Sequence, residues 1–119
     1  GRMSADPLPD STAGAQARLE ELRERIIAID DEIIELIGER QDLVLEIGRI
    51  KESLGLPILD PTREAQVVRR VAERSRALGV DEELTRDVIW RIISSARQTQ
   101  SQRSSSEPPP KPTEPSPEP

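Results

Sequence analysis

Apolar residues in the first half of the chain recur at alternating spacings of three and four positions. The series runs through Leu19, Leu22, Ile26, Ile29, Ile33, Leu36, Leu43, Ile47, Ile50 and Leu54. This spacing predicts one long helix with a heptad-like apolar seam, which Gly55 and Pro57 end. From about Ala15 to Ser53 that helix would be about 60 Å long, whereas a compact 90-residue domain has a radius of gyration of about 12 Å. One chain cannot cover such a seam, so we expect an interlocked homodimer, with a plain coiled-coil dimer as the simpler alternative.

Two shorter helices follow the long one. Asp60-Pro61 has the form of an N-cap followed by proline at the first helical position, and Gly79 ends this second helix. Asp81 then caps a third helix. The side chains expected to face inward are Val67, Val68, Val71 and Leu78 on the second helix and Leu84, Val88, Ile89, Ile92, Ile93 and Ala96 on the third. The predicted fold class is therefore all-α: a three-helix chain with one very long N-terminal helix, in an intertwined helical homodimer.

The domain boundaries follow from proline content. Residues 1–15 are small, polar and interrupted by Pro7 and Pro9, which predicts a flexible leader. Seven of the 11 prolines lie between Pro108 and Pro119, so residues 104–119 are expected to form a disordered Pro-rich tail. The folded domain is expected to span residues 16–103.

Composition excludes several classes of function. The chain has neither cysteine nor histidine, which rules out disulfides, Cys/His metal sites and catalytic triads that use histidine. A formal net charge of −6 argues against a nucleic-acid partner, because phosphate binding needs a basic surface. No apolar run approaches the roughly 20 residues of a membrane span, and no signal-peptide hydrophobic region is seen. We therefore expect a cytoplasmic protein that does not associate with membranes.

One cation interrupts the apolar seam of the long helix. Arg40 stands between Leu36 and Leu43, where a buried unpaired charge would be costly. Lys51 lies eleven residues further on and projects on the same side, with Val44 and Ile47 between the two cations. Two long cationic side chains beside an apolar floor are suited to a small dianion. The alternatives are a structural ion pair for Arg40 and a solvated helix-end charge for Lys51.

Three further polar positions have both a functional and a structural interpretation. Arg23 lies about 25 Å from Arg40 along the helix, so it could serve the same ligand only from the opposite chain of an antiparallel dimer; otherwise it pairs with Glu20 on the surface. Glu64 leads the apolar stripe of the second helix, where ordinary capping also explains a carboxylate. Gln100 continues the stripe of the third helix, unless it is a surface amide at a frayed end.

Taken together, these residues form an ordered set of motifs. The set is Leu22-Arg23-x-x-Ile26-x-x-Ile29-Asp30, Glu39-Arg40, Ile47-Gly48-x-x-Lys51, Pro57-x-x-Asp60-x-x-Arg63-Glu64, and Ile92-Ile93 ahead of Gln100. It resembles the all-α (AroQ-type) chorismate mutases over residues 17–102. The resemblance implies an intertwined homodimer with two equivalent active sites.

The resemblance also implies a reaction, the [3,3] rearrangement of chorismate to prephenate on the route to phenylalanine and tyrosine. By resemblance, Arg40 and Lys51 of one chain and Arg23 of the other bind the two substrate carboxylates. Lys51 and Gln100 flank the ether oxygen whose bond to carbon breaks. The rearrangement is unimolecular and transfers no proton, so neither a cofactor nor a metal is expected. Fixed cations and an amide suffice to stabilise the charge that develops on the ether oxygen.

The remaining implied contacts concern the substrate ring, and two positions depart from the family pattern. By resemblance, Glu64 and the backbone at Asp60 hold the ring hydroxyl, and Arg63 supports the polar wall. Ala96 stands where the family commonly has serine, so it is left out of the predicted site. The next residue, Arg97, replaces an often apolar one and is a possible extra contact.

Other functions stay open from the sequence. An isochorismate-pyruvate lyase or an amino-deoxychorismate mutase would use the same scaffold, although relatives with those activities tend to lose the acidic residue at the Glu64 position. A non-catalytic helical dimer module, with the tail recruiting a reader of proline motifs, is an alternative of another class. A complex with another shikimate-pathway enzyme is a further possible partnership.

Overall fold

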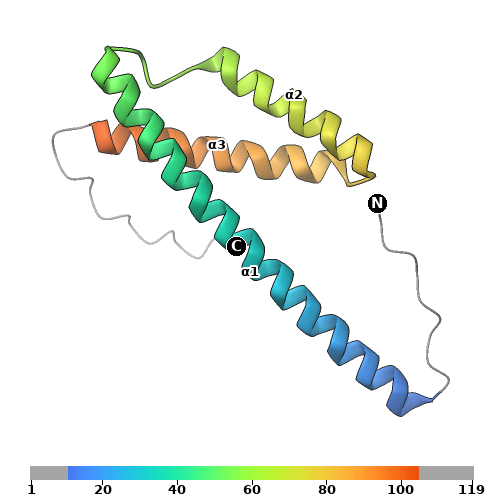
Figure 1. Cartoon of the computed structure of the whole chain (residues 1–119). Coiled ribbons are helices and arrows are strands. Elements are labelled where there is room, and N and C mark those ends of the chain that lie inside the picture. Colours follow the sequence, from blue (N-terminus) through green and yellow to red (C-terminus); the bar gives the residue numbers. More distant parts are fainter. Residues whose placement is uncertain (1–10, 105–119) are drawn as a thin grey trace, which may run out of the picture.

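The computed structural model describes residues 11–104, which form three α-helices and no strand. Helix α1 spans Thr12–Leu54, α2 spans Pro61–Leu78 and α3 spans Glu82–Ser104 (Figure 1). This confirms the predicted all-α class. The leader before residue 11 and the tail after residue 104 lie outside the described residues. Within residues 11–104, no helix combines the length and apolarity needed to cross a membrane.

Helix α1 begins earlier than its apolar pattern indicates. Ser11 is the N-cap, and its Oγ accepts a hydrogen bond of 2.9 Å from the backbone N–H of Gly14. Residues 12–15, which were expected to belong to the leader, are therefore helical, because a serine cap outweighs the absence of large apolar residues there. The other end is as predicted: Gly55 has a φ of 69°, and its N–H donates to the carbonyl of Glu52.

The two predicted ends of α2 and the predicted start of α3 are confirmed by hydrogen bonds at their caps. The Asp60 side chain accepts from the Arg63 N–H at 3.0 Å, and Pro61 is the first residue of α2. Gly79, with a φ of 68°, ends that helix. The Asp81 side chain accepts from the Leu84 N–H at 3.1 Å at the start of α3. These caps fix the positions of the two connections that turn the chain back on itself.

Helix α3 lies between the other two helices. It crosses the C-terminal half of α1 and packs along α2, while the N-terminal half of α1 extends away from both (Figure 1). The Cα radius of gyration is 19.8 Å, whereas a compact chain of this length would have about 13 to 14 Å. The three helices therefore pack together only around the C-terminal half of α1, and no other helix of the chain covers the N-terminal half.

The hydrophobic core of a single chain is very small. Among the described residues, only Ala72 and Ile93 are buried hydrophobic residues. Most residues of the α1 seam are exposed, as are Leu84 and Val88 on α3, which were expected to face inward. That expectation is wrong for the single chain, because α3 packs through Ile93 and its neighbours and leaves the Leu84 side of the helix uncovered. Apolar surface on this scale needs a further copy or a partner to cover it.

Candidate active site

A cleft of about 180 Å³ lies where the C-terminal half of α1, the start of α2 and the C-terminal half of α3 meet. It contains six of the seven residues predicted from the sequence. These are Arg40, Lys51, Asp60, Arg63, Glu64 and Gln100. Apolar side chains of Val44, Ile47, Ile58, Val67 and Ile93 line the same cleft. Residues up to 60 positions apart are thus assembled around one small volume.

Helix α1 supplies one wall of the cleft, with the predicted pair of cations and the apolar floor between them. Arg40 and Lys51 are both half-buried and line the cleft with Val44 and Ile47. Arg40 forms no hydrogen bond or ion pair with any residue in the described range. The structure thus shows no ion pair of Arg40 within this part of the chain, and the side chain lines the cleft.

Lys51 holds the connection between α1 and α2. Its Nζ donates a hydrogen bond of 3.1 Å to the carbonyl of Ile58. An ammonium group carries three hydrogens, so this bond leaves donors that can serve a ligand. Lys51 is therefore not merely a solvated charge at a helix end: it lines the cleft and is bonded to the connection between α1 and α2 at Ile58.

Gln100 reaches the cleft because α3 passes very close to α1 at Gly48. Gly48 is buried, and a Cβ atom placed on it would lie 3.4 Å from the Cγ of Gln100. The Gln100 Nε2 donates a hydrogen bond of 2.8 Å to the carbonyl of Val44. This bond across helices shows that Gln100 is not a frayed surface amide. The side chain is held at the crossing, beside the two cations of α1.

Glu64 and Arg97 form an ion pair that joins α2 to α3 at the cleft. The Arg97 Nε donates to Glu64 Oε2 at 2.7 Å, and Arg97 Nη2 donates to Glu64 Oε1. The Glu64 side chain is 14% exposed and the Arg97 side chain 45%. The hydrogen bond from Arg97 lowers the pKa of the Glu64 carboxyl, against an opposing effect of partial burial. This pair was not predicted from the sequence, since no local pattern links residues 33 positions apart.

The charges in the cleft differ in sign from those of the whole chain. Four cationic side chains and two carboxylates line it, which gives a formal charge of +2, whereas the chain carries −6. The cations are Arg40, Lys51, Arg63 and Arg97, and the carboxylates are Asp60 and Glu64. A concave positive site in an acidic protein focuses its field on small anions. The cleft is therefore suited to a ligand with two negative charges.

Arg23 is the predicted residue that the single chain does not bring to the cleft. It lies on the exposed N-terminal half of α1, about 25 Å from Arg40 along the helix. Its Nη1 is 3.3 Å from Glu20 Oε1, and the two side chains are 62% and 69% exposed. The surface ion pair considered for Arg23 is thus present, and exposed pairs of this kind contribute little to stability. This pairing leaves Arg23 accessible to a second chain.

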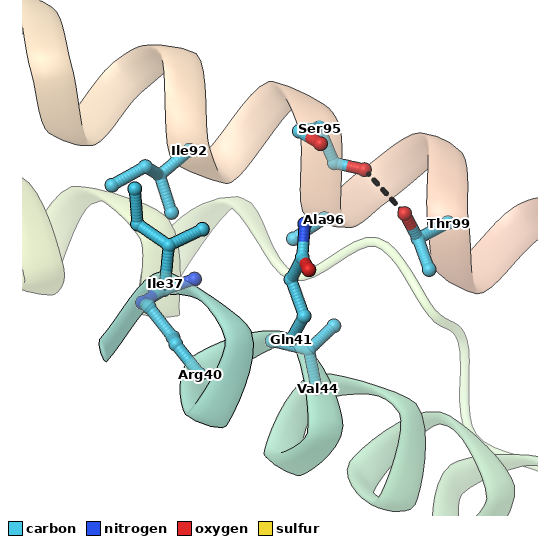
Figure 2. A pocket seen from close by; sticks show the side chains of 8 residues that line it. All are labelled: Ile37, Arg40, Gln41, Val44, Ile92, Ser95, Ala96 and Thr99. Atoms are coloured by element: carbon cyan, nitrogen blue, oxygen red, sulfur yellow. Dashed lines mark hydrogen bonds between the residues drawn. The ribbon is translucent and has the colours of Figure 1, made fainter. Parts of the chain in front are cut away.

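A second, smaller pocket of about 50 Å³ opens beside the cleft at the crossing of α1 and α3 (Figure 2). It was not predicted from the sequence. It is lined by Ile37, Arg40, Gln41, Val44, Ile92, Ser95, Ala96 and Thr99. The Thr99 hydroxyl donates a hydrogen bond of 3.0 Å to the carbonyl of Ser95 (Figure 2). The lining is largely apolar and shares Arg40 with the cleft, so it adds no separate set of reactive groups.

No group of three or more acidic, histidine or cysteine side chains within residues 11–104 is placed to hold a metal ion. The cleft contains four cationic side chains, the amide of Gln100 and two carboxylates that are held by hydrogen bonds. Such a set can bind a dianion and stabilise negative charge on oxygen.

Comparison with known proteins gives a consistent result. Residues 22–101 match the family described as chorismate mutase type II. The chain is 38% identical over 77 residues to the T-protein of Enterobacter agglomerans, covering 65% of this chain and 21% of that protein. It is 34% identical over 85 residues to the chorismate mutase of Methanocaldococcus jannaschii, covering 71% and 86% of the two chains. The structure of chorismate mutase (form II) from Thermus thermophilus matches with a TM-score of 0.67 at 29% identity, over 72% of this chain and 97% of that one. The chain thus spans about a fifth of the T-protein and most of the other two relatives.

Proposed function

The chain belongs to the type II chorismate mutase family, and we propose that its cleft rearranges chorismate to prephenate. The observation that carries the proposal is the charge of the cleft, +2 in a chain of −6, beside an apolar floor of Val44 and Ile47. Chorismate has two carboxylates and a largely apolar ring. Charge and shape of the cleft therefore complement this substrate.

The cleft supplies what a unimolecular rearrangement needs. The substrate must be held in a compact conformer, and negative charge that builds on the ether oxygen must be stabilised as the C–O bond opens. Arg40 binds a carboxylate, since its guanidinium has no other partner among the described residues. Lys51 and Gln100 lie on the adjacent walls and donate to the ether oxygen. Lys51 donates a hydrogen bond to the carbonyl of Ile58, and Gln100 donates one to the carbonyl of Val44. These bonds hold both side chains in the cleft before the substrate binds.

The start of α2 receives the ring hydroxyl. The Glu64 carboxylate accepts a hydrogen bond from the ring hydroxyl, and the backbone at Asp60 contacts the same hydroxyl. Arg63 lines the polar side of the cleft next to them. Asp60 is fixed as the N-cap of α2, because its side chain accepts from the Arg63 N–H. This contact favours a mutase over an isochorismate-pyruvate lyase, whose family members tend to lose the acidic residue at this position.

A homodimer completes each site. The apolar seam of α1 is exposed along the helix, and the core of one chain contains only Ala72 and Ile93 as buried hydrophobic residues in the described range. Packing α1 of one copy antiparallel to α1 of the other would cover the seam and bring Arg23 to the opposite cleft. Arg23 then binds the second carboxylate of the substrate. This intertwined arrangement also accounts for Leu84 and Val88, which the single chain leaves exposed.

The cellular context is part of the same proposal. The match occupies only 21% of the T-protein, so the same domain is there joined to a longer polypeptide. We infer a role in phenylalanine and tyrosine biosynthesis, in the cytoplasm, and a complex with another shikimate-pathway enzyme. Co-purification of the untagged chain with such an enzyme would support this partnership; a chain that elutes alone from fresh lysate would contradict it.

Arg40→Ala tests the proposed cleft directly. It removes a charge-assisted contact with a substrate carboxylate, which is typically worth about 1.5–3 kcal/mol, so we expect KM for chorismate to rise about 10–100-fold. Initial rates of chorismate disappearance over a range of substrate concentrations measure this. The matched control is Arg49→Ala, an exposed arginine of α1 outside the cleft, which should leave KM unchanged. Equal KM values for the two variants would remove Arg40 from the site.

A further inference from the structure

We propose that Arg97 is a positioning residue for this rearrangement: its two-pronged ion pair with Glu64 fixes the carboxylate that accepts the hydrogen bond of the substrate ring hydroxyl. The inference rests on the proposed function of the cleft. It assigns to Arg97 a role through Glu64, and not the direct extra contact with the substrate that the sequence left possible.

The geometry of the pair supports this role. Arg97 Nε and Nη2 donate to different oxygens of Glu64, so the guanidinium and carboxylate planes are matched edge to edge. A single hydrogen bond leaves a carboxylate able to rotate, whereas two parallel bonds fix its plane. Because Glu64 belongs to the first turn of α2 and Arg97 to α3, the pair also fixes the carboxylate relative to the opposite wall.

The ion pair does not use all of the hydrogen-bond acceptor sites of Glu64. The Glu64 side chain is 14% exposed and the Arg97 side chain 45%, so Arg97 is the more solvent-exposed partner. A carboxylate has about four lone-pair sites on its two oxygens, of which Arg97 uses two. The remaining sites can accept from a ring hydroxyl inside the cleft. Arg97 therefore orients Glu64 without occupying all of its capacity to accept hydrogen bonds.

The charged groups around Glu64 predict how Arg97 affects its ionisation. The hydrogen bond from Arg97 is the largest influence and lowers the pKa of the Glu64 carboxyl; partial burial and Asp60 raise it, and Lys51 on α1 lowers it. Two other cations line the cleft, Arg40 and Arg63. Without Arg97, partial burial and Asp60 would be opposed mainly by the smaller effect of Lys51, so the pKa of Glu64 would rise. The carboxylate would then become protonated, and lose acceptor capacity, at a higher pH than in the wild type.

A purely structural role is the alternative, in which the pair only joins α2 to α3. Such a role would change thermal stability but not the shape of the pH profile of kcat/KM. The two roles therefore differ in a measurable quantity. Arg97→Lys separates them further, because a lysine keeps the charge and loses the two-pronged geometry.

The experiment compares wild type, Arg97→Gln, Arg97→Lys and Arg91→Gln. Arg91 is an exposed arginine of the same helix that does not line the cleft, so it is the matched control. Carbon-13 NMR of labelled glutamate follows the Glu64 carboxyl through an acid titration, and steady-state kinetics with chorismate are recorded over the same pH range. For Arg97→Gln we expect a higher Glu64 pKa, an acidic limb of kcat/KM displaced to higher pH, and kcat/KM about tenfold lower near neutrality. Arg97→Lys should restore the low pKa and only part of the rate.

Three outcomes would overturn the proposal. An unchanged Glu64 titration in Arg97→Gln would show that the ion pair does not form, and leaves the proposed function intact. A raised pKa with an unchanged kinetic profile would make Arg97 structural only. A wild-type chain that titrates as expected but does not convert chorismate would refute the proposed function, and the positioning role with it.

Discussion

Lys51→Ala is expected to lower kcat at saturating chorismate by about 10²–10³-fold, which corresponds to roughly 3–4 kcal/mol of transition-state stabilisation. The reason is that Lys51 donates to the ether oxygen, where negative charge appears only as the C–O bond opens. Interactions that strengthen in the transition state affect turnover and not only affinity. Stopped-flow or steady-state rates at saturating substrate measure kcat separately from KM.

The variant also removes the hydrogen bond from Lys51 Nζ to the carbonyl of Ile58. Losing such a bond lowers the free energy of unfolding by about 1 kcal/mol. This is much less than the expected increase in the activation free energy. Lys51→Met, which keeps the aliphatic stem, should show the same loss of turnover with a smaller change in Tm. Glu52→Ala, an exposed neighbour outside the cleft, serves as the control. Wild-type kcat with only a raised KM in Lys51→Ala would make Lys51 a carboxylate anchor and refute its role at the ether oxygen.

The second large effect is expected from mixing two inactive proteins. At chorismate concentrations well below KM, Arg23→Ala and Lys51→Ala homodimers should each have very little activity, because every site needs Arg23 from one chain and Lys51 from the other. When the two are unfolded and refolded together in equal amounts, half of the dimers are heterodimers, and each heterodimer has one intact site. About a quarter of the wild-type activity should therefore return in such a twofold-symmetric assembly.

A matched mixture tests whether the sites are shared. Arg40→Ala and Lys51→Ala affect residues of the same cleft, so each site of their heterodimer carries one of the two defects. The refolded mixture should therefore be no more active than the average of the two homodimers. Native mass spectrometry would establish that heterodimers are present in both mixtures. If the Arg23 mixture stays inactive despite proven heterodimers, or if the wild type is a monomer at working concentration, the shared site is refuted.

Much of the fold follows from local sequence signals. The seam of α1 and the caps at Asp60, Gly79 and Asp81 are short-range features, because each depends on residues within one or two helical turns. They were predicted, and the structure confirms them. The start of α1 at Thr12 was missed, since a single serine cap determines it and no apolar periodicity does. Leu84 and Val88 were predicted to face inward but are exposed in the single chain. Burial depends on which helix covers a face, and local patterning does not specify that.

Some features of the cleft could likewise be predicted from the sequence, and others could not. Arg40 and Lys51 were placed together from helical spacing on α1 alone, and the structure brings both to the same cleft. The bonds from Lys51 to Ile58 and from Gln100 to Val44 depend on where a connection and a second helix lie. The Glu64–Arg97 pair likewise needs the register between α2 and α3. Such contacts follow from tertiary packing, so spacing along the sequence did not reveal them.

Product identification is the decisive test of whether this cleft makes prephenate. The purified 119-residue chain is incubated with chorismate, and the mixture is analysed by proton NMR and chromatography while the chorismate absorbance is followed. We predict that chorismate disappears with equimolar formation of prephenate and no release of pyruvate. Persistence of chorismate at the uncatalysed rate, or release of pyruvate in place of prephenate, would refute the proposed rearrangement.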